Sequence, residues 1–137
     1  MIIAAGAIFL SKNTKRVLLN FRSQHVKKGS TFGFWGGKIH DNEKILEGLS
    51  RELREEMGFI PDYEKIIPMD VFTSDDNKFR YYSYVIIVDD EFIPNINEES
   101  DGYLWCNIQK FPKQLHMGAK IILENSSFKN NLLKLVS

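Results

Sequence analysis

The chain has 137 residues, of which 43% are hydrophobic and 26% are charged, and this composition predicts one globular domain over residues 1–137. Lysine plus arginine equals aspartate plus glutamate, with 18 of each, so the balance argues against a broad basic face for extended nucleic acid. The single cysteine, Cys106, excludes an internal disulfide and a cysteine-based zinc site, and it favours a reducing compartment such as the cytoplasm.

The first part of the chain predicts strands. The apolar segment 2–10 predicts a buried strand, because it lacks the basic start of a secretory signal and is too short to cross a bilayer. A turn at 13–15 leads to a second strand at 16–22. The polar, basic segment 23–30 predicts a loop, and the aromatic, glycine-rich segment 31–39 predicts a short strand. No other apolar run approaches the length of a membrane helix.

The first predicted helix covers residues 43–57. The strand before it is expected to break at 36–37, where two glycines follow one another. Asp41 or Asn42 is expected to cap the start of the helix, and Gly58 suits its C-terminal stop.

The second half of the chain predicts three strands and one more helix. Two strands, 65–74 and 78–90, are expected to be joined by a tight connection at 75–77. A short strand at 102–108 precedes a C-terminal helix at 118–135. Strands mixed with two well-separated helices predict an α/β or α+β domain in which the helices pack on a sheet.

One face of the first helix carries an unusual cluster of acids. The expected core-facing stripe is formed by Leu46, Leu49, Leu53 and Met57. Glu52, Glu55 and Glu56 lie on an adjacent arc, where spacings of three and four residues bring like charges together. They also lie near the helix C-terminus, where the helix dipole disfavours anions. Local physics therefore opposes this arrangement twice.

Two interpretations of the acidic arc are possible from the residues alone. It is either a solvated face, partly neutralised by Arg51 and Arg54, or a site for hard divalent cations. Mg²⁺ and Mn²⁺ prefer carboxylate oxygens and keep several waters, so three glutamates on one helical turn would give them a pre-formed, open platform.

The spacing around the arc favours the cation site. Gly37 is followed after five residues by Glu43, and seven residues later the chain reads Arg-Glu, an aliphatic residue, any residue, Glu-Glu, any residue, glycine and a bulky apolar residue, ending at Phe59. This pattern resembles, position by position, the signature of the Nudix hydrolases (MutT-like), known as the Nudix box. Chance agreement is on the order of 10⁻⁸ for each starting position.

The resemblance implies a fold and an activity. It implies a Nudix-type α/β/α sandwich with a mixed β-sheet, and a metal-dependent pyrophosphohydrolase that uses Mg²⁺ or Mn²⁺. The substrate would be a small nucleotide in which a nucleoside diphosphate is linked to another moiety: a nucleoside triphosphate, a sugar nucleotide, ADP-ribose or a dinucleoside polyphosphate. Relatives are often homodimers. The alternative is a catalytically silent module that kept the fold to sense a nucleotide.

The resemblance also implies roles for individual residues. The expected metal ligands are Gly37, through its carbonyl, with Glu52, Glu55 and Glu56. Arg51 and Glu43 are expected to orient the ligands by charge-assisted hydrogen bonds. The general base is left open among Glu98, Glu99 and Asp101, with Glu99 preferred. Many relatives have a glutamate three residues before the tryptophan of the following strand, and this chain has Gly102 there.

Three residues outside the box are expected to bind substrate. Arg22 follows an apolar strand and is expected to meet a phosphate. Trp35 belongs to an aromatic cluster before Gly36 and is expected to stack on a base. His116 lies near the start of the C-terminal helix. The ordinary alternatives are a surface arginine, a core tryptophan and a histidine at a helix start with no such role.

Overall fold

The computed structural model describes residues 1–24 and 29–136; the middle of the loop predicted at 23–30 lies outside them. The elements in chain order are β1 (Ile2–Ser11), β2 (Arg16–Arg22), β3 (Phe32–Gly33), β4 (Trp35–Lys38), α1 (Ile45–Met57), β5 (Lys65–Thr73), β6 (Phe79–Val88), β7 (Ser100–Asn107), α2 (Met117–Leu123) and α3 (Ser126–Leu135). Every predicted strand is present with ends shifted by one or two residues, except that segment 31–39 forms two strands, β3 and β4. Within the described ranges, no helix is both long and apolar enough to cross a membrane.

The strands form one mixed sheet with β1 near its centre. The order is β3-β2-β1-β6-β5, with β4 pairing with β1 and β7 pairing with β2. The β1–β6 pair is parallel over the full length of β1, and the other pairs are antiparallel. The mixed sheet implied by the resemblance is therefore confirmed.

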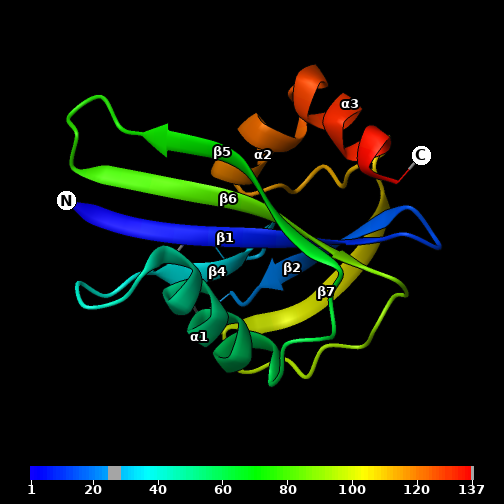
Figure 1. Ribbon diagram of the computed structural model, residues 1–137, viewed down its shortest axis with the longest axis horizontal. Helices are drawn as coiled ribbons and strands as arrows, with labels where there is room; N and C mark the ends of the chain where they lie inside the picture. Colours follow the sequence, from blue (N-terminus) through cyan, green and yellow to red (C-terminus); the bar gives the residue numbers. More distant parts are fainter. Residues whose placement is uncertain (25–28, 137) are drawn as a thin grey trace.

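Helices cover both faces of this sheet, with α1 on one side and α2 and α3 on the other (Figure 1). Strand β1 is apolar without interruption because alternate residues feed two cores. Ala5, Ala7 and Phe9 pack on the α1 side, whereas Ile8 and Leu10 pack on the α2 and α3 side. The α/β/α layers expected from the resemblance are therefore present.

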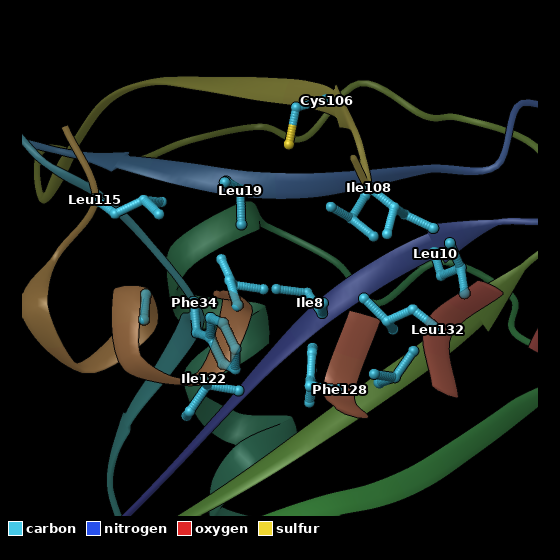
Figure 2. Close-up of a cluster of buried hydrophobic side chains, with 14 of the residues drawn as sticks. Ile8, Leu10, Leu19, Phe34, Cys106, Ile108, Leu115, Ile122, Phe128 and Leu132 are labelled. Atoms are coloured by element: carbon cyan, nitrogen blue, oxygen red, sulfur yellow. The ribbon is translucent and has the colours of Figure 1, made fainter. Parts of the chain in front are cut away.

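The core beneath α2 and α3 joins residues from both ends of the chain (Figure 2). Phe34 and Ile8 from the sheet meet Ile122 of α2 and Phe128 and Leu132 of α3. Burying one large aliphatic or aromatic side chain contributes about 1.5–3 kcal/mol. This cluster fixes α2 across the sheet, and so it also fixes the start of α2 beside β3.

Several local predictions differ from the structure. The chain leaves the sheet at Phe34 rather than at 36–37, because both glycines pair with β1 within β4. The cap of α1 is Lys44 rather than Asp41 or Asn42, and the Lys44 N–H donates to Glu47 one turn later. Leu46 is 47% exposed, so it is not part of the core-facing stripe.

The C-terminal helix predicted at 118–135 is in fact two helices. The chain turns after Glu124, and the Asn125 side chain accepts a hydrogen bond from the Phe128 N–H to start α3. Asparagine is a strong helix-capping residue because its side-chain oxygen satisfies a free backbone donor of the first turn. At the other end of α1, Gly58 adopts the predicted left-handed conformation, with φ of 80°.

Candidate active site

Helix α1 packs closely against the strand β4 and the residue that follows it, and two glycines lie at this contact. A Cβ atom on Gly37 would lie 2.7 Å from the carboxyl carbon of Glu52. A Cβ atom on Gly48 would lie 2.6 Å from Ile39 Cδ1, which agrees with close packing of the helix on the sheet. The Gly37 backbone and the Glu52 carboxylate are thereby held side by side.

Arg51 gathers the acidic groups at the outer part of the site. Its guanidinium donates to both oxygens of Glu43 at 2.8 and 3.1 Å, and it also binds the Lys38 carbonyl at 3.0 Å. Nη1 bridges Glu52 at 3.0 Å and Glu55 at 3.2 Å. The Arg51 hydrogen bonds lower the pKa of Glu43 to about 2. The arginine therefore holds the carboxylates of Glu52 and Glu55 in place by charge-assisted hydrogen bonds.

Glu56 points inward from α1 and is nearly fully buried. Its Oε1 accepts a hydrogen bond of 2.5 Å from the Gly36 N–H. Its Oε2 lies 3.5 Å from Asn20 Nδ2, and the Ser100 hydroxyl donates to Asn20 Oδ1 at 2.5 Å. A buried chain of polar groups from β4, β2 and β7 therefore holds this carboxyl in place.

Two of the box carboxyl groups ionise less readily than an ordinary glutamate. Burial raises the pKa of Glu56 to about 8, and the charges of Glu52 and Glu99 act in the same direction. The Gly36 hydrogen bond and the Arg22 charge oppose this shift. Burial likewise raises the pKa of Glu52. Such perturbed carboxyl groups gathered on one helix mark a functional site.

Glu99 lies on a loop that is tied to the C-terminal half of α1. Asn97 Nδ2 donates to the Glu55 carbonyl at 2.8 Å, and Asn97 Oδ1 accepts from the Glu99 N–H at 2.9 Å. The Glu99 charge raises the pKa of both Glu52 and Glu56. By contrast, the Asp101 carboxylate accepts from the Gln24 N–H. Of the three acids that were left open as the base, Glu99 is the one that acts on the box glutamates.

The acids are suitable donors for a hard divalent cation, although they are not pre-formed as a cation platform. Among the described residues, no three Asp, Glu, His or Cys side chains are placed together as metal binding requires. The expected pre-formed platform is therefore wrong, because Arg51 bridges Glu52 and Glu55 while Glu56 turns to Gly36. The donor set still fits Mg²⁺ or Mn²⁺, since it offers carboxyl oxygens, and a bound cation would favour the ionised form of Glu52 and Glu56.

The three expected substrate residues fall in two places. Arg22 and His116 meet at Gly33, where a Cβ atom would lie 3.4 Å from His116 Cβ and 3.9 Å from Arg22 Cδ. His116 also starts α2, since its Nδ1 accepts from the Gly118 N–H at 3.1 Å. Trp35 is fully buried, and its Nε1 donates to the Leu18 carbonyl. The expectation that Trp35 stacks on a base is therefore wrong.

Two polar residues at the site were missed from the sequence. Asn20, which contacts Glu56, interrupts the apolar run of β2, and a lone amide in a buried strand is a signal that was available. Tyr81 lies within electrostatic range of Glu56 and Arg22. It was one of three tyrosines on a predicted strand, and alternation alone did not say which of them faces the site.

The architecture gives the class of the protein first. The fold resembles that of the MutT NUDIX hydrolase from Burkholderia pseudomallei, with a TM-score of 0.68 and 21% identity over 91% of this chain and 97% of that chain. It also resembles MutT from Methanosarcina mazei, with a TM-score of 0.70 and 19% identity over 98% and 94% of the two chains. For RenU, a Nudix hydrolase from M. smegmatis, the TM-score is 0.73, with 14% identity over 99% and 86%. These likenesses show a MutT-type fold.

The family follows from the sequence match. The model of the NUDIX domain matches residues 2–125, so the chain belongs to the Nudix family. "Nudix hydrolase 7" from Arabidopsis thaliana is 36% identical over 67 residues, which are 48% of this chain and 24% of that protein. The match thus spans about a quarter of the curated relative.

Proposed function

We propose that this protein is a metal-dependent pyrophosphohydrolase that cleaves a nucleoside diphosphate linked to another moiety, by attack of water at phosphorus. One observation carries the proposal. The Gly37 backbone lies beside the Glu52 carboxylate, and the charges of Glu52 and Glu99 both raise the pKa of the buried Glu56. A solvated surface patch would need neither a buried carboxyl group nor two glycines in the neighbouring strand.

The cofactor would be Mg²⁺ or Mn²⁺, held by Glu52, Glu55, Glu56 and the Gly37 carbonyl. When bound, such an ion offsets the repelling charges of the diphosphate and makes water more acidic. Arg51 orients the Glu52 and Glu55 carboxylates through the hydrogen bonds described above. Glu99, on its tethered loop, is proposed to take the proton from the attacking water.

The phosphate end of the substrate would meet Arg22 and His116. The effect of the Arg22 charge on the pKa of Glu56 supports this role. A guanidinium binds phosphate oxygens well because its planar donors match their geometry. His116 lies beside it at the start of α2.

Product analysis over a nucleotide panel tests the proposal. The panel contains nucleoside triphosphates, sugar nucleotides, ADP-ribose and dinucleoside polyphosphates, each with Mg²⁺, with Mn²⁺ and with EDTA. We expect cleavage between phosphates that requires one of the two ions. In ¹⁸O water the label should enter a phosphate product, because water attacks phosphorus.

A double variant separates the enzyme from a nucleotide sensor. Glu55→Gln with Glu56→Gln should lose turnover by a factor of at least about 10² while circular dichroism stays unchanged. A silent sensing module would instead show no turnover in the wild type and nucleotide binding that the double variant keeps. The expected cytoplasmic location and homodimer stay predictions, which cell fractionation and sedimentation would measure.

A further inference from the structure

A row of small residues crosses the sheet beside the acidic site. Gly36 of β4 pairs with Gly6 of β1, and Gly6 pairs with Ser83 of β6. Adjacent strands lie about 4.8 Å apart, so Ser83 lies about 9.6 Å from Gly36 along this row. The Gly36 N–H already binds the Glu56 carboxyl. The row therefore leads from the box glutamates across the face that also bears α2.

Tyr81 reaches over this row from β6. A Cβ atom on Gly6 would lie 1.8 Å from the Tyr81 hydroxyl oxygen, so that oxygen occupies space that any other residue at position 6 would fill. The ring lies 6.5 Å from Phe34 and stacks on Phe79 at 6.4 Å, measured between ring centroids. Neighbouring aromatic rings thus hold the phenol with its hydroxyl above the central strand.

The Tyr81 hydroxyl oxygen lies beside a second hydroxyl, because it sits over Gly6 and Gly6 pairs with Ser83. The Ser83 hydroxyl is buried and has no hydrogen-bond partner among the described residues. Buried hydroxyls ordinarily find a partner, because an unmatched polar group costs about 1–3 kcal/mol. An unmatched hydroxyl next to the Tyr81 phenol indicates a polar partner from outside the protein.

Electrostatics place the Tyr81 hydroxyl toward the reaction site. Burial raises the pKa of this phenol above its ordinary value, with a further contribution from the Glu56 charge, while the Arg22 charge opposes the shift. The group is therefore a neutral phenol at every working pH, able to donate one hydrogen bond and accept another. A group that both donates and accepts matches a ligand hydroxyl, which does the same.

We propose that Tyr81 is a substrate-positioning residue whose hydroxyl binds a hydroxyl of the sugar attached to the cleaved diphosphate. This inference rests on the proposed function. The phosphates would lie at the box glutamates and Arg22, and the Tyr81 hydroxyl lies over Gly6, which pairs with Gly36 beside Glu56. A sugar is the part of a nucleotide that directly follows its phosphates, and its oxygens are uncharged hydroxyls. The same chemistry is offered by a ribose or by a second sugar on the far phosphate.

Matched substrates that differ by one hydroxyl test the inference. kcat/KM is measured for ATP against dATP, and for UDP-glucose against UDP-2-deoxyglucose. The wild type should prefer the hydroxylated member of at least one pair, and that pair identifies which sugar is bound. Tyr81→Phe should reduce this preference about tenfold, the value of one hydrogen bond, and should leave the deoxy substrate nearly unchanged. Gly6→Ala should reduce the same preference, because the added methyl group displaces the hydroxyl.

Tyr82→Phe is the matched control, since Tyr82 lies next along β6 and packs on the opposite face. It should leave the preference unchanged. An equal loss for both members of a pair in Tyr81→Phe would overturn the inference, as would an unchanged preference. If no substrate is cleaved, the affinities for AMP and dAMP are measured by calorimetry instead. Tighter binding of AMP that Tyr81→Phe abolishes would keep the inference and refute the proposed function, whereas equal binding would refute the inference.

Discussion

Glu56 is a carboxyl group that α1 carries into the protein interior, where it has one short hydrogen bond to backbone and one long contact to an amide. Both Glu52 and Glu99 make its ionisation harder. Under the proposed function this cost in stability has a reason, because the carboxyl group would bind a cation.

Replacement of Glu56 by glutamine should therefore stabilise the metal-free protein. The introduced amide keeps the shape of the side chain and can still accept from the Gly36 N–H, but it carries no charge to desolvate. In EDTA at pH 8 we expect the free energy of unfolding to rise by about 1 kcal/mol or more, measured by urea titration. Added Mg²⁺ should raise the Tm of the wild type and not that of Glu56→Gln. A lower stability in EDTA would contradict this account of Glu56.

Glu99 and Glu98 form a natural pair for testing the base. Both are exposed neighbours on one loop, and the Glu99 charge is among the causes that raise the pKa of Glu52 and Glu56. Glu99→Gln should lower kcat by about 10²–10⁴ with little change in KM, because proton transfer is lost. Glu98→Gln should behave like the wild type. Equal effects of the two substitutions in steady-state kinetics would remove Glu99 from the mechanism.

At the scale of elements, the loop before α1 is fastened to the helix by one ion pair. Glu43 accepts two hydrogen bonds from Arg51, which lies two helical turns along α1. Arg51 also binds the carbonyl of Lys38 at the end of β4. This clamp joins strand, loop and helix on the side where the box carboxylates lie.

The clamp predicts a loss of stability in acid. The folded pKa of Glu43 is about 2, below the ordinary value of 4.5 for the unfolded chain. A lowered pKa stabilises the folded state fully above the unfolded value, and this contribution is lost as the pH falls from about 4.5 toward 2. Urea titrations at pH 7, 4.5 and 3 should therefore show a smaller decline for Glu43→Gln than for the wild type. Parallel declines would exclude the clamp.

The end of α1 gives a second prediction at this scale. Gly58 has φ of 80°, and a Cβ atom there would lie 3.1 Å from Asn95 Cβ. Gly58→Ala should lower the free energy of unfolding by about 1 kcal/mol or more. Gly102→Ala is the control, since a Cβ atom there makes only an ordinary contact of 3.9 Å with Phe21. Thermal unfolding of both variants measures the difference.

For the whole molecule, the sequence predicted the layers better than it predicted the site. The apolar run of β1 and the spacing of α1 are one-dimensional patterns, so the sheet, the helix and the acidic arc could be read directly. The burial of Trp35 could not be predicted. In a strand that is covered on both faces, the sequence pattern does not show to which face each aromatic side chain points. The bridging position of Arg51 also depends on contacts with β4 that no local pattern contains.

The split of the C-terminal segment was missed for a similar reason. Apolar spacing continues through Glu124, so periodicity alone predicts one helix. The break arises from the side chain of Asn125, whose capping bond to Phe128 N–H lets α3 start in a new direction. The position of Tyr81 could not be predicted either, because its hydroxyl lies over Gly6 of a different strand.

The parallel pairing of β1 with β6 has a consequence for how the chain reaches its native state. Every pair in that ladder joins residues separated by 77 positions, from Ile2 with Phe79 to Ser11 with Val88. Contacts between such distant segments slow folding, because a long loop must close before they are gained. During synthesis the apolar strand β1 therefore leaves the ribosome well before its parallel partner β6. The interval before β6 emerges is the stage at which this protein is most open to aggregation and to capture by chaperones.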